Sequence, residues 1–455
     1  MQLKKHTKTI EYRVSMLNRR ILMPANTILF LGYLLSVRTI IGQTVYVHWM
    51  MLFQGVSMTS LLILGIAADS RARIDWLKHN AFAVLYICTR FITLILTGFD
   101  ITVLRSIWLE TFYLLAVTDI LTGGFSGNKV QKNILCVSSI LINAANLVIY
   151  LGYSRFPEEL QRVLRANTIV EKYPFAAICT NPNAGGIFGA TVLIISLIWF
   201  ARSKGIIQKT AAGLFAAFHL ICFLVLYRSV RSADVALAAT GILFLAGLIF
   251  RQLRGRAAVL VTLVCMLLGI AALGWFYTRP ENSRLRTLND QEFQLMELST
   301  GRTIIWKTCF ASLNETSVLG RGSLRLDRQY RKEYIDTHAE DAHDLYYNSA
   351  GYEPHNGYLA MISVTGWVGF SLCMIHMILQ FLRAKHLDHS WWYLVPVYVL
   401  VNNFFEGLFI LDHFIPCLYL FMILRDTTPD IQKPKGDSAG SGAANEKSNR
   451  MYRQR

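Results

Sequence analysis

Residues 257–276 read AAVLVTLVCMLLGIAALGWF, a run without a charged side chain. About 20 apolar residues in an α-helix are enough to cross the ~30 Å hydrocarbon core of a bilayer. Residues 45–68 and 356–382 form two further runs of this kind. An α-helix satisfies its own backbone hydrogen bonds, which lipid requires. These runs therefore predict a chain that crosses a membrane repeatedly as α-helices.

The composition agrees with an all-α polytopic membrane protein. Of the 455 residues, 53% are hydrophobic and only 16% are charged. The apolar residues cluster into about twelve runs, or eleven if the last two, which only a tight turn separates, are counted as one. The predicted spans are 22–37, 45–68, 80–98, 101–121, 133–153, 185–201, 207–227, 231–250, 257–276, 356–382, 391–409 and 412–425.

These spans divide the chain into five regions. We expect a cytoplasmic N-terminal tail at 1–21, nine spans within 22–276, a large extracytoplasmic loop at 277–355, three spans within 356–425 and a disordered cytoplasmic tail at 426–455. Lys and Arg concentrate in the two tails and the short loops between alternate spans. The positive-inside rule then places both termini in the cytoplasm.

The formal net charge of +16 is explained by this topology. We therefore interpret it as a sign of membrane orientation rather than of nucleic-acid binding. No GxxxxGK[ST] or GxGxxG motif occurs, and the inner loops are short. ATP-driven chemistry is not expected, nor is a bound cofactor.

The large loop contains the stretch STGRTIIWKTCFASLNETSVLGRG (299–322), which predicts a helix that begins at Ser299 or Thr300 and stops at Gly320. An apolar stripe on one face suits a helix lying in the outer membrane interface; packing against neighbouring loop residues is the alternative, and the two are compatible. The stripe consists of Ile305, Trp306, Cys309, Phe310 and Leu313. The charged residues of 324–348 predict a solvated surface.

A polar stretch ends in Pro354-His355-Asn356 where the span at 356–382 begins. The first turn of a helix offers unpaired N–H groups that suit a phosphate. An imidazole at this height is able to act as a base near neutral pH. On spacing alone, a histidine that only anchors the helix end is the more favoured reading.

Arginines supply the complementary charge for an anionic substrate. Arg228 and Arg231 lie in a very short outer connection, and Arg302 and Arg321 flank the predicted loop helix. A guanidinium group binds phosphate through a bidentate fork, so these positions suit a lipid diphosphate. Snorkelling and general contact with lipid headgroups remain the alternatives.

The order of these motifs resembles the O-antigen ligase/polymerase family. GRTIIW and LGRG are followed by PHNGYL and TGWVGF, while NPNAGG (181–186) and SVR (229–231) precede them. The resemblance covers roughly residues 180–382. It implies a GT-C-like membrane glycosyltransferase in a bacterial inner membrane. Its donor would be a glycan on undecaprenyl pyrophosphate, and its acceptor another glycan.

The resemblance also assigns roles to residues. Arg231 and Arg302 would hold the pyrophosphate, with Arg228 competing for that role, and His355 would activate the acceptor hydroxyl. Asn356 would orient His355 or a sugar. Other substrate-binding positions are Arg321, Tyr358 and Asn183. A flippase and a chain-length regulator are the expected protein partners.

Metal is not required by this reading. The first outer loop lacks the paired acids that would hold Mg²⁺ on a phosphate. In HAEDAHD (338–344), His338 and His343 are five residues apart rather than four. We expect a charged surface there.

Several alternatives stay open. Polymerisation of lipid-linked repeat units is the favoured function, ligation to lipid A core or protein is the alternative, and a lipid-linked oligosaccharide flippase or a scaffold are rivals. Within the spans, Arg90 and Glu110 predict an ion pair that closes the helix bundle, with a substrate or proton path as the sharper reading. Glu406, near the outer end of its span, is a weak further candidate for the site.

Overall fold

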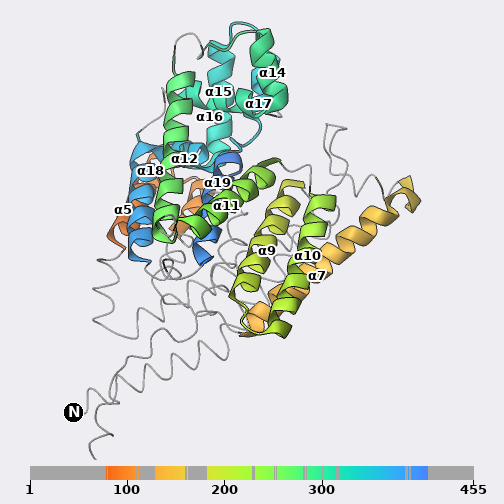
Figure 1. Ribbon diagram of the computed structural model, residues 1–455. Helices are drawn as coiled ribbons and strands as arrows, with labels where there is room; N and C mark the ends of the chain where they lie inside the picture. Colours follow the sequence, from red (N-terminus) through yellow and green to blue (C-terminus); the bar gives the residue numbers. More distant parts are fainter. Residues whose placement is uncertain are drawn as a thin grey trace, which may run out of the picture.

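A computed structural model provides the structure of the chain (Figure 1). Every named element within its described part is a helix, and a single isolated bridge joins Leu285 to Ala339. The structure describes residues 78, 80–108, 110–111, 129–158, 161, 182–227, 231–250, 252, 254–279, 282, 284–299, 301–313, 315, 318–384, 388 and 391–407.

Within those residues, five helices are long and apolar enough to cross a membrane. They are α9 (Pro182–Arg202), α10 (Ile206–Leu226), α11 (Arg231–Ile249), α12 (Arg256–Tyr277) and α18 (Gly357–Arg383). Each coincides with a predicted span, because long apolar runs without proline in their interior leave the helix as the only way to pair the backbone in lipid.

Two shorter apolar helices, α5 (Ala81–Leu96) and α7 (Lys129–Gly152), coincide with predicted spans as well. A short 3-10 turn, η3 (Tyr153–Arg155), follows α7. The span predicted at 101–121 is described as helical over 101–108 and at 110–111. The spans at 22–37, 45–68 and 412–425 and both tails lie outside the described residues. The count of about twelve therefore stays a prediction.

The span predicted at 391–409 is shorter than expected. A 3-10 turn, η6 (Trp391–Tyr393), leads into α19 (Leu394–Phe405). The helix ends at Phe405 because Glu406 takes an extended conformation, with φ −141° and ψ 150°. Its carboxylate is thereby directed away from the helix, toward residues that begin three other helices.

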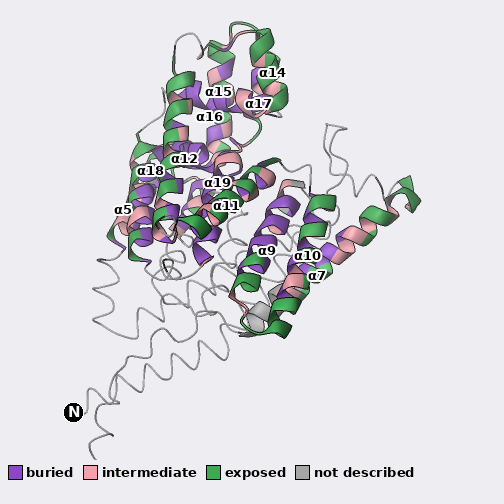
Figure 2. Cartoon of the chain, in the orientation of Figure 1, coloured by how far each residue is buried: buried purple, intermediate pink, exposed green. Residues whose placement is uncertain are grey.

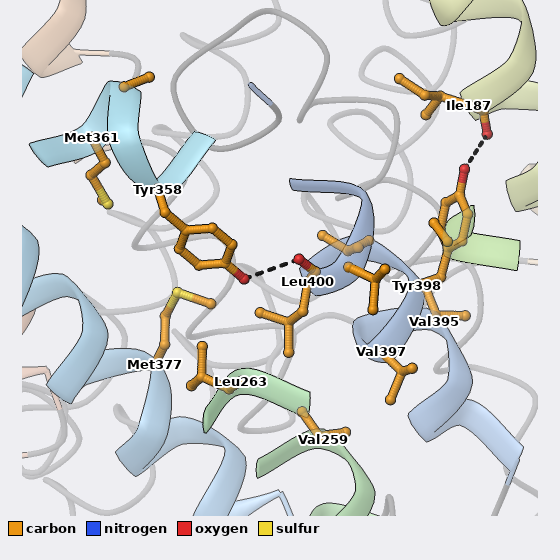
Figure 3. Close-up of a cluster of buried hydrophobic side chains, with 14 of the residues drawn as sticks. Ile187, Val259, Leu263, Tyr358, Met361, Met377, Val395, Val397, Tyr398 and Leu400 are labelled. Atoms are coloured by element: carbon orange, nitrogen blue, oxygen red, sulfur yellow. Dashed lines mark hydrogen bonds between the residues drawn. The ribbon is translucent and has the colours of Figure 1, made fainter. Parts of the chain in front are cut away.

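The core lies where α9, α12, α18 and α19 meet (Figures 2 and 3). Two tyrosines buried there have hydrogen-bonded hydroxyl groups: Tyr358 donates to the Leu400 carbonyl at 3.0 Å, and Tyr398 donates to the Ile187 carbonyl at 3.4 Å. The outward faces of α10, α11 and α12 instead expose many apolar side chains. An exposed apolar surface of this kind is typical of contact with lipid.

Four helices of the large loop gather at one end of the molecule, at the top of Figure 1. They are α14 (Asp290–Leu298), α15 (Arg302–Leu313), α16 (Leu324–His338) and α17 (His343–Ala350). Helix α14 starts with a capping box, in which the Asn289 side chain accepts from Glu292 N and the Glu292 side chain accepts from Asn289 N. This group of four helices is called the cap below.

The apolar stripe of the loop helix is covered by protein, and its position relative to the membrane surface stays a prediction. Every residue from Ile304 to Leu313 of α15 is buried. On its apolar side, Phe310 stacks on Tyr277 of α12, with ring centroids 5.7 Å apart. The other helices of the cap cover its polar side. The packing alternative is confirmed. The helix also starts at Arg302 and ends at Leu313, so it is shorter than predicted.

The charged stretch 324–348 is a solvated surface only in part. Asp327 and Arg331 of α16 are fully buried. Asp327 binds Arg321 at 2.6 Å and Arg331 at 3.0 Å, and Arg331 also donates to the Tyr352 carbonyl at 2.8 Å. Buried charges persist where they are paired in this way, and the pairs tie α16 to the loop before it.

Candidate active site

The ends of the helices lie at two opposite ends of the bundle. Next to the cap, α9, α11 and α18 begin and α19 ends. At the opposite end, Arg202 of α9 lies over the Trp392 ring at 5.6 Å, and Arg256 of α12 pairs with Asp388 at 2.7 Å. The alternating directions expected of successive spans are therefore observed, and the long loop and its motifs lie at one end.

His355 occupies a constrained position at the start of α18. Its φ angle of 47° lies in the left-handed region, which residues other than glycine seldom adopt. The residues on either side hold it there. Trp306 Nε1 donates to the Pro354 carbonyl at 2.8 Å, and the Asn356 side chain caps α18 by accepting from Leu359 N at 2.9 Å.

Glu406 is the centre of the site. Its Oε1 accepts from Arg302 Nη2 at 2.5 Å and from Asn183 Nδ2 at 2.9 Å. Its Oε2 lies 3.3 Å from His355 Nδ1. The Glu406 side chain is only 4% exposed, whereas that of His355 is 31% exposed. One buried carboxylate therefore gathers three residues that the sequence predicted for the site.

These residues come from helix starts. Asn183 is the second residue of α9, Arg302 is the first of α15, and His355 and Asn356 immediately precede α18. Each N-terminus carries a partial positive charge and unpaired N–H groups. Three such ends, together with the Arg302 guanidinium, favour an anion at this place.

Arg231 lies at the edge of the same group. It is the first residue of α11, and its Nη1 donates to the Leu298 carbonyl at 2.5 Å. Leu298 ends α14, and the turn that follows it leads directly to Arg302. The side chain of Arg231 is exposed and so keeps other N–H groups available. Arg228 lies outside the described residues, so its competition with Arg231 stays open.

Comparison with known proteins gives a family match. Residues 215–374 match a family model described as O-Antigen ligase. This part of the chain is similar to O-antigen ligases. The resemblance read from the motifs is thereby confirmed, and the match indicates a membrane enzyme of polysaccharide assembly. No curated protein and no solved structure matched the chain.

The matched segment contains Arg231, Arg302 and His355. Asn183 precedes it and Glu406 follows it. Glu406 contacts Arg302 and His355 directly, and Asn183 donates to the same Glu406 oxygen as Arg302. Sequence reasoning ranked Glu406 low. An acidic side chain in an otherwise apolar span often belongs to a functional site. On that ground Glu406 could have been placed among the stronger candidates.

Other predicted substrate residues lie elsewhere in the matched segment. Arg321 is buried against Asp327. Tyr358 is fully buried and bonded to the Leu400 carbonyl, as Figure 3 shows. Asn356 is adjacent to His355 but is also fully buried. Arg321 and Tyr358 support the fold around the site, and a direct contact with substrate stays a prediction for both.

The HAEDAHD stretch lies on the outer face of the cap. The rings of His338 and Tyr334 stack at 4.1 Å, and His343 Nε2 lies 2.8 Å from Asp336 Oδ1. The neighbouring carboxylates raise the pKa of His343, chiefly through the hydrogen bonds that they accept from the imidazole, first Asp336 and then Asp344. Among the described residues, no three His, Cys, Asp or Glu side chains are grouped as a metal site would require.

Proposed function

We propose that this protein is a glycosyltransferase that polymerises oligosaccharide repeat units carried on undecaprenyl pyrophosphate, at the extracytoplasmic face of a bacterial inner membrane. The observation that carries the proposal is the bridge from Arg302 to His355 through Glu406. Arg302 and His355 share this carboxylate at converging helix starts, and both lie in the segment that matches the O-Antigen ligase model. This supports the pairing of a cation with a base at one site.

The donor pyrophosphate binds, in this proposal, to Arg302 and Arg231. Arg302 directs Nη2 to Glu406, and a guanidinium carries five N–H groups in a planar fork. The remaining N–H groups of Arg302 and the exposed guanidinium of Arg231 are suited to phosphate oxygens. The helix starts of α9, α15 and α18 add their partial charges to the same site.

His355 acts as the general base toward the acceptor sugar. A carboxylate accepts hydrogen bonds only, so Glu406 favours the tautomer in which Nδ1 carries the proton. Nε2 is then left with the lone pair that removes a proton from the acceptor hydroxyl. Glu406 holds the ring in position and stabilises the imidazolium that results, as the third group of a catalytic triad does.

The transfer step follows from these positions. The acceptor oxygen forms a bond to the anomeric carbon of the donor as its proton passes to His355. The bond from that carbon to the pyrophosphate oxygen breaks, and its electron pair leaves with the pyrophosphate. Negative charge grows on the leaving group, where Arg302 and Arg231 stabilise it. Cleavage of the bond between sugar and pyrophosphate supplies the energy. We therefore propose that the reaction requires neither a nucleotide nor a metal.

Ligation of the lipid-linked glycan to lipid A core or protein is the second candidate function. The description of the matching family, O-Antigen ligase, favours it. The bridge from Arg302 to His355 serves both reactions equally, because they share the donor and differ only in the molecule that supplies the hydroxyl. The choice of acceptor therefore decides between them.

The experiment is a gel profile of surface polysaccharide in a strain that lacks the gene. Attached glycan restricted to one repeat unit supports polymerisation, while loss of all attached glycan supports ligation. Complementation with His355→Ala or Arg302→Ala should fail at normal protein levels, and His338→Ala, an exposed histidine of the cap, should restore the wild-type profile. Full-length polysaccharide from both site variants would refute the enzyme. Accumulation of inward-facing single-unit lipid in the deletion strain would instead point to a flippase.

A further inference from the structure

Helix α18 is broken in its middle. Gly366 has φ 66° and ψ 179°, far from helical values, and it separates residues 357–365 from residues 367–383. A break of this kind leaves carbonyl groups without their usual partners four residues later. Because lipid supplies no hydrogen bonds, protein groups must satisfy them.

The loop 318–322 fills the break. Arg321 N donates to the Ser363 carbonyl and Gly322 N donates to the Val364 carbonyl, both at 2.9 Å. A Cβ on Gly366 would lie 2.0 Å from Val318 O, and one on Gly320 would lie 2.3 Å from Gly366 N. Only glycine allows this approach. We call residues 318–322 together with 363–368 the α18 clasp.

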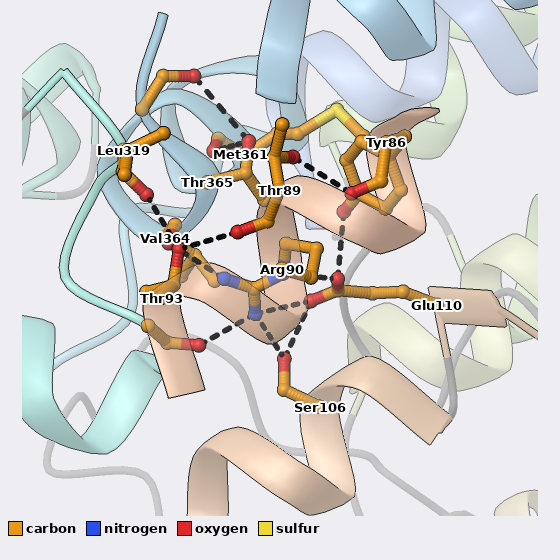
Figure 4. A network of polar contacts seen from close by, with 12 residues as sticks. Tyr86, Thr89, Arg90, Thr93, Ser106, Glu110, Leu319, Met361, Val364 and Thr365 are labelled. Atoms are coloured by element: carbon orange, nitrogen blue, oxygen red, sulfur yellow. Dashed lines mark hydrogen bonds and ion pairs between the residues drawn. The ribbon is translucent and has the colours of Figure 1, made fainter. Parts of the chain in front are cut away.

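Arg90 of α5 enters the clasp from the other side (Figure 4). Its Nη1 donates to the Val364 carbonyl at 3.1 Å and its Nη2 to the Gly322 carbonyl at 2.6 Å. One side chain therefore binds both segments of the clasp. Arg90 is fully buried, so neither bond is shared with water.

Glu110 holds the Arg90 guanidinium in this orientation. Arg90 Nε donates to Glu110 Oε2 at 2.6 Å and Nη2 donates to Oε1 at 3.0 Å. The Tyr86 hydroxyl donates to Oε2 at 2.7 Å, and the Ser106 hydroxyl donates to Oε1 at 2.5 Å. The ion pair predicted from the sequence is confirmed. All three guanidinium nitrogens are engaged, which disfavours the alternative of a substrate path.

We propose that Arg90 is a positioning residue for the transfer reaction. The segment 357–365 is fixed at its far end by the clasp, and its near end carries Asn356 and His355. Arg90 donates hydrogen bonds to the Val364 and Gly322 carbonyls, which an apolar side chain at this position could not do. By fixing the far end of the segment 357–365, it sets the direction from which His355 approaches Glu406. This inference rests on the proposed function of His355.

On this proposal, the catalytic scaffold extends beyond the matched segment. Arg90 and Glu110 both precede residues 215–374, yet their contacts with Gly322 and Val364 lie within it. The helices at 81–111 are, on this view, part of the catalytic scaffold. A buried ion pair contributes little net stability compared with apolar packing, so its value here is the geometry that it specifies.

The test compares Arg90→Lys with a control at the opposite end of the bundle. Lysine keeps the charge for Glu110 but has no fork for two carbonyls. We expect kcat for glycan transfer to fall at least tenfold in reconstituted protein, with the donor KM within twofold and the thermal midpoint retained. Gly366→Ala, which opens the clasp from the other side, should lower kcat likewise. Arg256→Lys, at the Asp388 pair, should leave kcat unchanged.

A covalent staple keeps the test decisive if Arg90→Lys is also less stable. Val318 and Trp367 belong to the two different segments of the clasp and are both exposed, so cysteines at these positions would test a disulfide that joins the segments. In molecules shown to be cross-linked, the staple should restore kcat of the Arg90→Lys variant at least fivefold, and reduction should remove the gain. Equal kcat before and after reduction, or wild-type kcat in Arg90→Lys, would overturn the proposal.

The same assay separates this inference from the function on which it rests. If the wild-type protein transfers glycan and His355→Ala does not, then an active Arg90→Lys variant refutes the positioning role alone. If His355→Ala is as active as the wild type, the proposed function itself fails.

Discussion

His355 and Glu406 are separated by 51 residues in the chain, yet Nδ1 of the histidine lies 3.3 Å from Oε2 of the glutamate. They belong to opposite ends of different helices: His355 precedes α18, and Glu406 follows α19. The second oxygen of Glu406 binds Arg302 at 2.5 Å. The orientation of the base and the charge of the donor site therefore depend on one carboxylate.

Glu406→Gln should reduce transfer by about 10- to 100-fold, because the amide neither fixes the tautomer of His355 nor balances the imidazolium charge. A double-mutant cycle provides the measurement. If the two residues act as one unit, the double variant His355→Ala/Glu406→Gln will be no slower than His355→Ala. Additive losses would show that Glu406 acts separately from His355.

Asn356→Ser should separate the capping role of this residue from a role toward substrate. Serine caps helix starts about as well as asparagine, so the thermal midpoint should change little. Asn356 Nδ2 is buried without a hydrogen-bond partner within the described part of the chain, and serine removes it. We expect transfer to fall about tenfold if that donor is used by a sugar. Wild-type transfer in this variant would reduce Asn356 to a helix cap.

Glu292 should make the cap sensitive to acid. Burial acts to raise its pKa, but the hydrogen bond from Asn289 N and the charge of Lys307, 3.3 Å away, together lower it from the ordinary value of 4.5. Its contribution to stability is then present above that ordinary value and lost as pH falls through the lowered pKa. Lys307 does not show the corresponding rise in its own pKa, because its burial lowers that pKa more than the neighbouring Glu292 raises it.

Thermal unfolding between pH 3 and pH 7 tests this prediction. Glu292→Gln should have a lower unfolding midpoint than the wild type at pH 7, and the gap should close toward pH 3. Glu297→Gln, an exposed position on the same helix, provides the control and should show a small gap at every pH. A gap for Glu292→Gln that is constant with pH would contradict the assignment.

Gly320→Ala should destabilise the protein much more than Gly98→Ala. Both glycines have positive φ, 77° and 66° respectively, so alanine costs roughly 1–2 kcal/mol at either position. At Gly98 a Cβ meets nothing within 4 Å, whereas at Gly320 it would lie 2.5 Å from the Val364 carbonyl oxygen. Overpacking adds about 1–3 kcal/mol there. Equal unfolding midpoints for the two variants would show that the clasp is not closed.

The spans could be predicted because lipid allows few alternatives to a helix for a long apolar run. The same reasoning could not decide the surroundings of α15, since an apolar stripe has the same pattern whether lipid or protein covers it. Here Lys307, Thr308 and Ser312 on its polar side are buried as well. The actual bounds depend on Gly301, whose positive φ precedes the first turn.

The candidate site was only partly predictable. Asn183, Arg302 and His355 were proposed from motif order, and the structure groups them. Motif order gave no direction for the side chains of Arg321 and Tyr358, which depends on how α16 and α19 pack around them. Glu406 was only a weak candidate in the sequence, and its central position is seen once three other segments, which carry Asn183, Arg302 and His355, meet at its carboxylate. The glycines of LGRG and TGWVGF serve a backbone contact that no spacing rule predicts.

A single-turnover assay tests the central claim most directly. Purified protein in liposomes would receive a labelled oligosaccharide on a polyprenyl diphosphate together with an acceptor glycan, with EDTA and without nucleotide. The account predicts transfer by the wild type, and donor binding within about twofold in His355→Ala with transfer slower by roughly 100-fold or more. Transfer by His355→Ala at the wild-type rate would contradict it.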